Sequence, residues 1–424
     1  MGETLRKPGY LKALVFSAII GVPVSLVAFW FLGAVHELEH LIWSSWPGAA
    51  GWARPPWWWP LPLAVVPAVA VVLAVRYLPG QGGHVPAAGH LGGASKAALP
   101  GVVLAALCCL PFGVVLGPES PLIALGGGLA LFFRDLVRAP ATRAGTALLG
   151  AAGSAAAISA IFGNPLVGAI LLIEGAGLGG PQLFAVMLPV LLAGGVGSIV
   201  FTGFGHWTGV KTGSLTLQLP PPPRLDTGDV VWSLLMGVAL GVALHYVTGL
   251  GRRIAVAVVP RPGPVIAASA AGMAVCVALY SVATGRSPAE AALSGQSTLA
   301  KLAQDPHSWP VAALVAVLAF KGVAYALCLG SLRGGPIFPS LFLGGAAGVL
   351  LAPLPGFGVV PAMAAGMAAS SAAVLRLPVS SVVLVALLVG HVDALPVIML
   401  AAVAAFVTVE LMPQGPKVPP FQGS

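Results

Sequence analysis

The residue with the clearest capacity for chemistry is Glu119, the only charged residue between Lys96 and Arg134. The short motif around it reads Gly117, Pro118, Glu119, Ser120 and Pro121. A carboxylate deep in an apolar segment is costly and commonly marks an ion or proton pathway. At a helix N-terminus, unpaired N–H groups and the helix dipole can stabilise its charge, and the same groups would bind a free anion when the carboxylate moves away. The carboxylate could also take up a proton, or it could simply cap its own helix.

Two further glycine- and proline-punctuated helix starts accompany the glutamate. One consists of Gly335, Pro336, Ile337, Phe338 and Pro339. The other consists of Gly82, Gly83, His84, Val85 and Pro86. Neither contains a carboxylate, but backbone N–H groups at such helix starts can bind an anion. Together with Glu119, the three motifs predict an anion site that is built from helix N-termini and backbone N–H groups, not from Lys or Arg.

Internal repetition organises the chain around these motifs. Residues 117–127 and 335–345 share the pattern G-P-x-x-P-x-x-x-L-G-G, and residues 153–165 and 366–378 share a glycine, three alanines and a final proline. The matching separations predict a duplicated unit of roughly 200 residues. Duplicated membrane units commonly surround a site at the bilayer midplane that is formed by broken helices.

A rival site is the sequence His36-Glu37-Leu38-Glu39-His40. It satisfies H-E-x-x-H, which on a helix places two histidines on one face as zinc ligands and a glutamate as general base. An intramembrane zinc metalloprotease is therefore an alternative function from a different class. A third ligand is expected in such an enzyme, and only Asp393 among the aspartates lies near an apolar segment. The alternative to a zinc site is a polar helix end at the membrane interface.

The composition restricts the class of protein that must position these residues. Of 424 residues, 58% are apolar and 8% are charged, and the mean hydropathy is +0.98. A soluble domain carries about 25% charged residues, so a soluble enzyme, a secreted disulfide scaffold and a disordered chain are excluded. The unbroken apolar runs also exclude a transmembrane β-barrel, in which polar and apolar residues alternate. The net charge of +8 is attributed to basic membrane-flanking loops, not to a nucleic-acid surface.

The apolar runs predict an all-α, polytopic membrane protein with about 14 to 18 helical pieces, many of them tilted or broken. Several runs are shorter than the roughly 20 residues that one span requires. With 56 glycines and 39 prolines, the chain is rich in residues that interrupt helices. We expect one transmembrane domain over residues 1–412, with inverted repeat halves at about 61–215 and 230–412. A short tail at 413–424 follows, without an appended soluble domain.

The motifs and their order resemble those of the CLC family of chloride channels and chloride/proton exchangers. The family signatures GSGIP, G(K/R)EGP and GxFxP correspond to GGHVP at 82–86, GPESP at 117–121 and GPIFP at 335–339. The segment from Asn164 to Glu174 is similar to the family's APLAG…IIEE segment. The resemblance covers about residues 75–412. It implies a gating role for Glu119, an anion pathway along the three motifs and a homodimer in which each subunit has its own pathway.

The chain also departs from the family pattern. Gly83 replaces a serine, His84 replaces a glycine, and Pro118 replaces a basic residue and removes an N–H donor. Ile337 takes the usual phenylalanine position, and Phe421 falls near the family's ion-coordinating tyrosine, without its hydroxyl. Of the internal glutamate pair linked to the proton path in exchangers, only Glu174 is present, because the second position is Gly175.

From these residues we expect transmembrane transport of chloride or another small monovalent anion by a channel-like or weakly proton-coupled pathway. A chloride/proton antiporter is the alternative within the family, since water beside Gly175 could still deliver protons. We expect no enzymatic activity, cofactor, metal or nucleic-acid partner. The expected location is the plasma (inner) membrane, with the lipid bilayer and a second copy of the chain as partners.

Overall fold

The computed structural model describes residues 8–89, 95–138, 142–177, 180–210, 212, 217, 219–220 and 224–419. The regular structure in these ranges is helical, and the extended pairing found there is an isolated bridge between Gly117 and Gly335. Eight helical stretches are long and apolar enough to cross a membrane. They are Gly9–Ala49, Pro60–Tyr77, Gly145–Phe162, Leu183–Thr208, Thr227–Val258, Pro262–Thr284, Val311–Ser331 and Val392–Leu411. The prediction of an all-α, multi-pass membrane protein is therefore confirmed.

The N-terminal part of the chain runs from α2 to α10 and contains the first two motifs. Its α-helices are α2 (Pro8–His40), α3 (Trp46–Ala49), α4 (Pro60–Leu63), α5 (Val65–Tyr77), α6 (Leu99–Cys109), α7 (Glu119–Leu136), α8 (Arg143–Phe162), α9 (Pro165–Gly175) and α10 (Gly180–Thr208). A π-helical turn, η1 (Leu41–Ser45), joins α2 to α3. Short 3₁₀ turns are η2 (Pro79–Gly82), η3 (Pro86–Ala88), η4 (Lys96–Ala98) and η5 (Leu110–Phe112).

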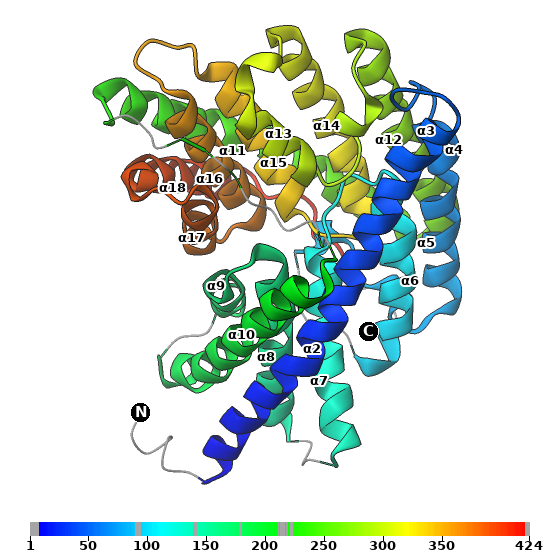
Figure 1. Cartoon of the computed structure of the whole chain (residues 1–424), viewed down its shortest axis with the longest axis vertical. Helices are drawn as coiled ribbons and strands as arrows, with labels where there is room; N and C mark the ends of the chain where they lie inside the picture. Colours follow the sequence, from blue (N-terminus) through cyan, green and yellow to red (C-terminus); the bar gives the residue numbers. More distant parts are fainter. Residues whose placement is uncertain are drawn as a thin grey trace.

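The C-terminal part begins at α11 and contains the third motif. Its α-helices are α11 (Thr227–Val258), α12 (Pro262–Thr284), α13 (Gln296–Gln304), α14 (Val311–Ser331), α15 (Ile337–Leu351), α16 (Val359–Leu375), α17 (Pro378–Val389) and α18 (Leu395–Leu411). Its 3₁₀ turns are η6 (Pro288–Glu290), η7 (Pro306–Ser308) and η8 (Val392–Ala394). In Figure 1, α7 to α10 lie in the lower part of the view and α11 to α18 in the upper part.

The repeated glycines lie where helices of each half approach most closely. A Cβ atom on Gly126 of α7 would collide with the carbonyl of Gly153 of α8. In the same way, a Cβ atom on Gly344 of α15 would collide with the carbonyl of Gly366 of α16. The two helix pairs α7/α8 and α15/α16 therefore pack by the same backbone contact, at corresponding positions of the two sequence repeats.

Short helices follow each of these pairs because the chain breaks at corresponding sites. Gly163 ends α8 in a left-handed conformation (φ 62°), and the Asn164 side chain accepts a hydrogen bond from Leu166 N (2.9 Å) to cap α9. In the second half, Arg376 adopts φ 56° at the end of α16, and Pro378 begins α17. Proline is favoured at the first turn of a helix because no N–H is needed there. With 11 and 12 residues, α9 and α17 are shorter than one span.

Candidate functional site

The two Gly-Pro motif loops meet in the interior of the protein. Gly117 N donates to Gly335 O (2.8 Å), and Gly335 N donates back to Gly117 O. Each loop leads directly into a helix, α7 at Glu119 and α15 at Ile337. The antiparallel bridge thus brings two buried helix N-termini together, each with a partial positive charge.

The Glu119 side chain occupies the space between these N-termini. It is fully buried, and its Oε1 accepts a hydrogen bond from Phe338 N (2.9 Å) in the opposite half. Its Oε2 has no hydrogen-bond donor among the described residues. That oxygen lies against Gly117 and Gly335, where any Cβ would collide with it. Both glycines are therefore required by the position of the carboxylate, which binds the helix start as a free anion would.

Buried contacts hold the α15 start in place. Tyr325 of α14 donates its hydroxyl proton to Pro336 O (2.7 Å), and Ser340 Oγ donates to Ile337 O (2.7 Å). The Phe338 ring stacks on Phe162 with centroids 5.4 Å apart and an interplanar angle of 25°. These contacts fix the direction of the Phe338 N–H. The hydrogen bond to Glu119 comes from Phe338 N, so the backbone of Phe338, not only that of Ile337, belongs to the site.

A cavity of about 30 Å³ lies next to the residues that follow Glu119 in α7. The loop 82–86 supplies part of its lining, and Ser120 and Pro121 of α7 supply another part. Gly82 and Gly83 have φ values of 76° and 97°, which L side chains rarely adopt. His84 is exposed at the surface while it also lines the cavity. The structure thus brings the first and second motifs together at a space that can hold one small ligand.

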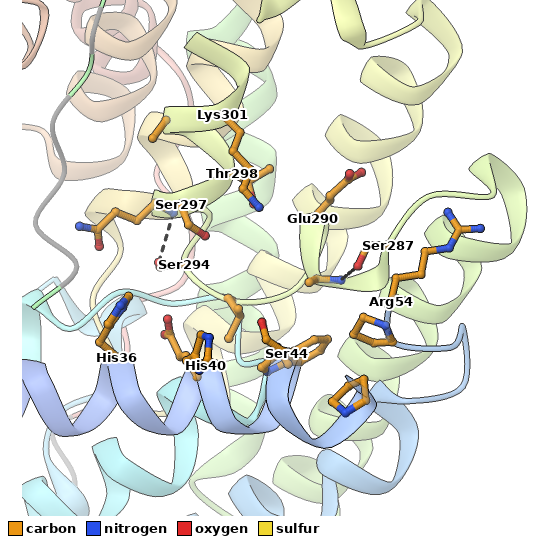
Figure 2. Close-up of a pocket in the computed structure, with 18 of the residues that line it drawn as sticks. His36, His40, Ser44, Arg54, Ser287, Glu290, Ser294, Ser297, Thr298 and Lys301 are labelled. Carbon is orange, nitrogen blue, oxygen red and sulfur yellow. Dashed lines mark hydrogen bonds between the residues drawn. The ribbon is translucent and has the colours of Figure 1, made fainter. Parts of the chain in front are cut away.

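A much larger hollow of about 850 Å³, the vestibule, is lined in part by Leu116 and by Pro118, the residue before Glu119. Figure 2 shows His36, His40 and Ser44 on one wall and Ser294, Ser297, Thr298 and Lys301 on the opposite wall. Arg286 lines the vestibule next to Glu290, with which it pairs at 2.7 Å. Burial lowers the pKa of Arg286, but the hydrogen bonds to Glu290 outweigh this effect and raise it above its ordinary value. The vestibule therefore gives solvent access to the loop that precedes Glu119.

The H-E-x-x-H sequence lies on the vestibule wall. His36 and His40 line the vestibule, and His40 Nδ1 is 3.3 Å from Ser45 Oγ, whereas Glu37 is exposed. Within the described part of the chain, no group of three or more His, Cys, Asp or Glu side chains is arranged to hold a metal ion. The third ligand that a catalytic zinc requires is thus not found among these residues, and the arrangement gives no support to the metalloprotease alternative.

The Glu174 carboxylate connects the two halves. Its oxygens accept hydrogen bonds from Val379 N (3.1 Å), Ser380 N (2.6 Å) and Ser380 Oγ (2.5 Å) at the start of α17. It therefore caps a helix of the opposite half, although it belongs to α9. Gly175 is the exposed last residue of α9. Phe421, the remaining predicted site residue, lies outside the described residues.

Two buried cations, Lys321 and Arg333, follow from the structure. From the sequence, Lys321 was expected either to raise the positive potential of the pathway or to pair with a carbonyl, whereas Arg333 was assigned no role. Lys321 donates to the carbonyls of Ala291, Ala292 and Leu293 at 2.7–3.2 Å. Arg333 is 2% exposed and lines the small cavity, which corrects the expectation that the site contains no arginine. Its signal was that it stands two residues before Gly335 in an apolar region.

These features define an all-helical membrane protein with a buried carboxylate held on paired helix N-termini. The sequence model described as "Voltage gated chloride channel" matches residues 68–410, so the chain belongs to this family. The family resemblance inferred from the motifs is confirmed.

Relatives and solved structures agree with this assignment. The chain is 26% identical to the ion-transport protein YfeO of Escherichia coli strain SMS-3-5 over 78% of its own length and 77% of the relative. The same identity and coverage are found with YfeO of Escherichia fergusonii. A crystal structure of a CLC-type fluoride/proton antiporter matches with a TM-score of 0.69 and 20% identity over 94% of this chain and 95% of the other. That of a slow cyanobacterial Cl⁻/H⁺ antiporter matches with a TM-score of 0.74 and 18% identity over 94% of each chain. At these identities the two structures establish the fold.

Proposed function

We propose that this protein transports chloride, or another small monovalent anion, across a membrane along a pathway gated by Glu119. The observation that carries the proposal is the hydrogen bond from Phe338 N to Glu119 Oε1. A carboxylate on this helix start occupies a place that a free anion would otherwise take. The resemblance of the three motifs to those of chloride transporters supports chloride as the default substrate.

The position of Glu119 between two hollows suggests how the gate works. The vestibule reaches Pro118, and the small cavity reaches Ser120, so the residues on either side of Glu119 line different spaces. While the carboxylate is ionised and bound to Phe338 N, it separates the two spaces. Protonation removes its charge and weakens its attraction to the helix N-terminus. The side chain then leaves, and an anion passes through the vacated place.

Whether protons are transported together with the anion is the second part of the proposal. We favour a channel-like or weakly coupled pathway, because Gly175 stands where the family's exchangers have an ionisable residue. Glu174 does not replace that residue in this proposal, since its carboxylate caps α17. The alternative is a chloride/proton antiporter. The two solved structures support this alternative mildly, since one is described as a fluoride/proton and the other as a Cl⁻/H⁺ antiporter.

The remaining expectations also belong to this proposal. Resemblance to the family favours a homodimer in which each subunit has a complete pathway, with no enzymatic activity, cofactor or metal. The plasma (inner) membrane is the proposed location. Exposed apolar side chains on α9, α10, α17 and α18 offer a face that lipid or a second copy could cover. They include Leu166, Ile199, Val379 and Val403.

Flux measurements in liposomes test the proposal. Purified protein is reconstituted with chloride inside, and chloride efflux is recorded with an electrode, with protein-free liposomes as the control. We expect protein-dependent efflux that changes with pH. If well-folded protein releases no chloride, bromide, nitrate or fluoride at acidic or neutral pH, anion transport is excluded.

A further inference from the structure

Arg333 is a buried cation without an ionic partner in the described structure. Its side chain is 2% exposed, and no carboxylate of the described residues forms an ion pair with it. Its contacts are to two carbonyl oxygens. Nε and one terminal nitrogen donate to Gln81 O (3.3 and 3.0 Å), and the other terminal nitrogen donates to Ser331 O (3.4 Å). A guanidinium has five N–H groups, so these contacts leave part of its donor capacity unused.

The charges of two other buried cations, Lys321 and Arg134, are compensated by neighbouring groups. Lys321 has three N–H donors, and three carbonyl oxygens lie within 3.2 Å of its nitrogen. Arg134 is 8% exposed, and it pairs with Asp135 at 2.6 Å and donates to Thr146. Burying an unpaired charge is strongly unfavourable. Arg333 therefore lacks a compensation that its two counterparts have.

The surroundings of Arg333 contain space for a compensating ion. Arg333 and Gly334 line the 30 Å³ cavity together with the loop 82–86 and residues of α7. The Gln81 carbonyl that Arg333 holds belongs to the residue before this loop. A cavity of this size accommodates one small ion or a water molecule, but not phosphate or an organic acid. Ser120, the residue after Glu119, also lines the cavity, so an ion within it would lie close to the gate.

We propose that Arg333 supplies the fixed positive charge of the pathway and that its counter-ion is the transported anion, held in this cavity. The inference rests on the anion transport proposed above and adds a charged, specificity-determining residue to it. The guanidinium attracts any small monovalent anion and disfavours cations. Because it also binds two carbonyl oxygens, its charge is partly offset, which allows the anion to leave again.

Anion binding to purified full-length protein tests this role. Calorimetric titration with chloride is carried out on the wild type, Arg333→Met, Arg333→Lys and the control Arg134→Met. A charge-assisted contact is worth about 1.5–3 kcal/mol, so we expect Arg333→Met to weaken chloride binding by roughly tenfold to 100-fold. Arg333→Lys retains the charge but loses the planar fork that binds Gln81 O, so it should weaken chloride binding less than Arg333→Met does. Arg134→Met removes a paired arginine elsewhere and should leave the affinity unchanged.

A second variant keeps the proposal testable if Arg333→Met does not fold. Ala124→Glu places a carboxylate among the lining residues of the same cavity. If Arg333 lacks a counter-charge, it should neutralise the new carboxylate, so Ala124→Glu should fold. The variant should then no longer bind chloride. Chloride binding by Arg333→Met or by Ala124→Glu at wild-type affinity would overturn the role of Arg333. Absence of chloride flux in the folded wild type would instead overturn the proposed function.

Discussion

At the scale of single residues, Glu119 combines complete burial with a hydrogen bond to a helix start in the other half of the chain. Lower pH protonates the carboxyl group, weakens that contact and should increase anion flux. Glu119→Gln mimics the protonated form, so we expect its flux at pH 7.5 and at pH 5 to agree within about twofold. Chloride efflux from liposomes at both pH values measures this.

The matched control for this variant is Glu119→Asp, which keeps the charge but shortens the side chain by one methylene. It should retain a pH dependence, although at a different level of flux. Unchanged flux and unchanged pH dependence in both Glu119→Gln and Glu119→Ala would remove Glu119 from the gate.

Anion selectivity also depends on single residues, namely on the hydrogen-bond donors that line the pathway. Pro118 and Pro336 have no N–H to donate, and Gly83 has no hydroxyl. Discrimination among ions depends on donors matched to one of them, whereas a charge such as that of Arg333 attracts all small anions. We expect chloride, bromide and nitrate to permeate within about tenfold of one another, or roughly 1.4 kcal/mol. Reversal potentials in planar bilayers or anion-exchange fluxes measure the ratios, and a strong preference for one ion would show that other donors, such as His84, rebuild the site.

At the scale of elements, close glycine contacts hold the helices that present the site. Gly344 of α15 has no room for a Cβ against α16, whereas Gly150 of α8 has no heavy atom within 4 Å of a Cβ placed there. Gly344→Ala should therefore destabilise the protein by about 1–3 kcal/mol through overpacking. Gly150→Ala is the matched control and should be neutral or slightly stabilising. Thermal unfolding in detergent, monitored by fluorescence-detected size exclusion, compares Gly344→Ala with Gly150→Ala. Equal transition temperatures would mean that α15 and α16 can move apart without loss of stability, against this prediction.

The cap between α9 and α17 makes a second prediction at this scale. Glu174 accepts three hydrogen bonds at the start of α17. Glu174→Ala should lower stability by about 0.5–2 kcal/mol, as expected for the loss of a helix cap. Because Glu174 acts as a structural cap in our proposal, chloride flux per folded protein and its proton dependence should not change. Loss of proton movement with unchanged stability would instead place Glu174 on a proton route.

The repeats were predictable from the sequence because the backbone geometry at corresponding positions requires particular residue types, namely glycine and proline. Glycine at 126 and 344 permits close helix contact, and proline at 165 and 378 begins a new helix after a break. The all-α fold followed from the apolar composition, and the family followed from the resemblance of the three motifs to its signatures. The sequence predicted that the motif loops form one anion site, but it could not predict the bridge between Gly117 and Gly335, because that bridge depends on tertiary contacts.

The role of Arg333 could not be predicted in the same way. Its position next to Gln81 joins residues that are far apart in the sequence, and no local pattern specifies that proximity. The H-E-x-x-H sequence shows the opposite case, in which a local pattern suggests a metal site that the described residues do not complete. Local sequence patterns predict backbone geometry well, but they do not predict which side chains from distant parts of the chain come into contact.

At the scale of the whole molecule, the open question is whether anion flow is coupled to protons. Coupling requires a route along which protons reach Glu119 from one side of the membrane, separate from the path of the anion. Gly175 carries no ionisable group, and the Glu174 carboxylate is bound at α17. We therefore expect a chloride gradient to drive chloride through the protein without sustained proton movement. Chloride and pH are recorded together in proteoliposomes of wild-type protein and of Gly175→Glu.

The two proteins distinguish the channel-like pathway from the antiporter. If Gly175 is the missing link, the wild type moves chloride alone, and Gly175→Glu acquires measurable proton movement in the opposite direction, because its new carboxyl group can receive protons from water at the exposed end of α9. Gly175→Gln is the control, since it adds a side chain of similar size that cannot titrate. Uphill proton pumping by the wild type at a fixed ratio to chloride would instead establish the antiporter. Water beside the small Gly175 would then have to carry the protons, and Gly175→Leu, which fills that space, should slow them while chloride flux continues.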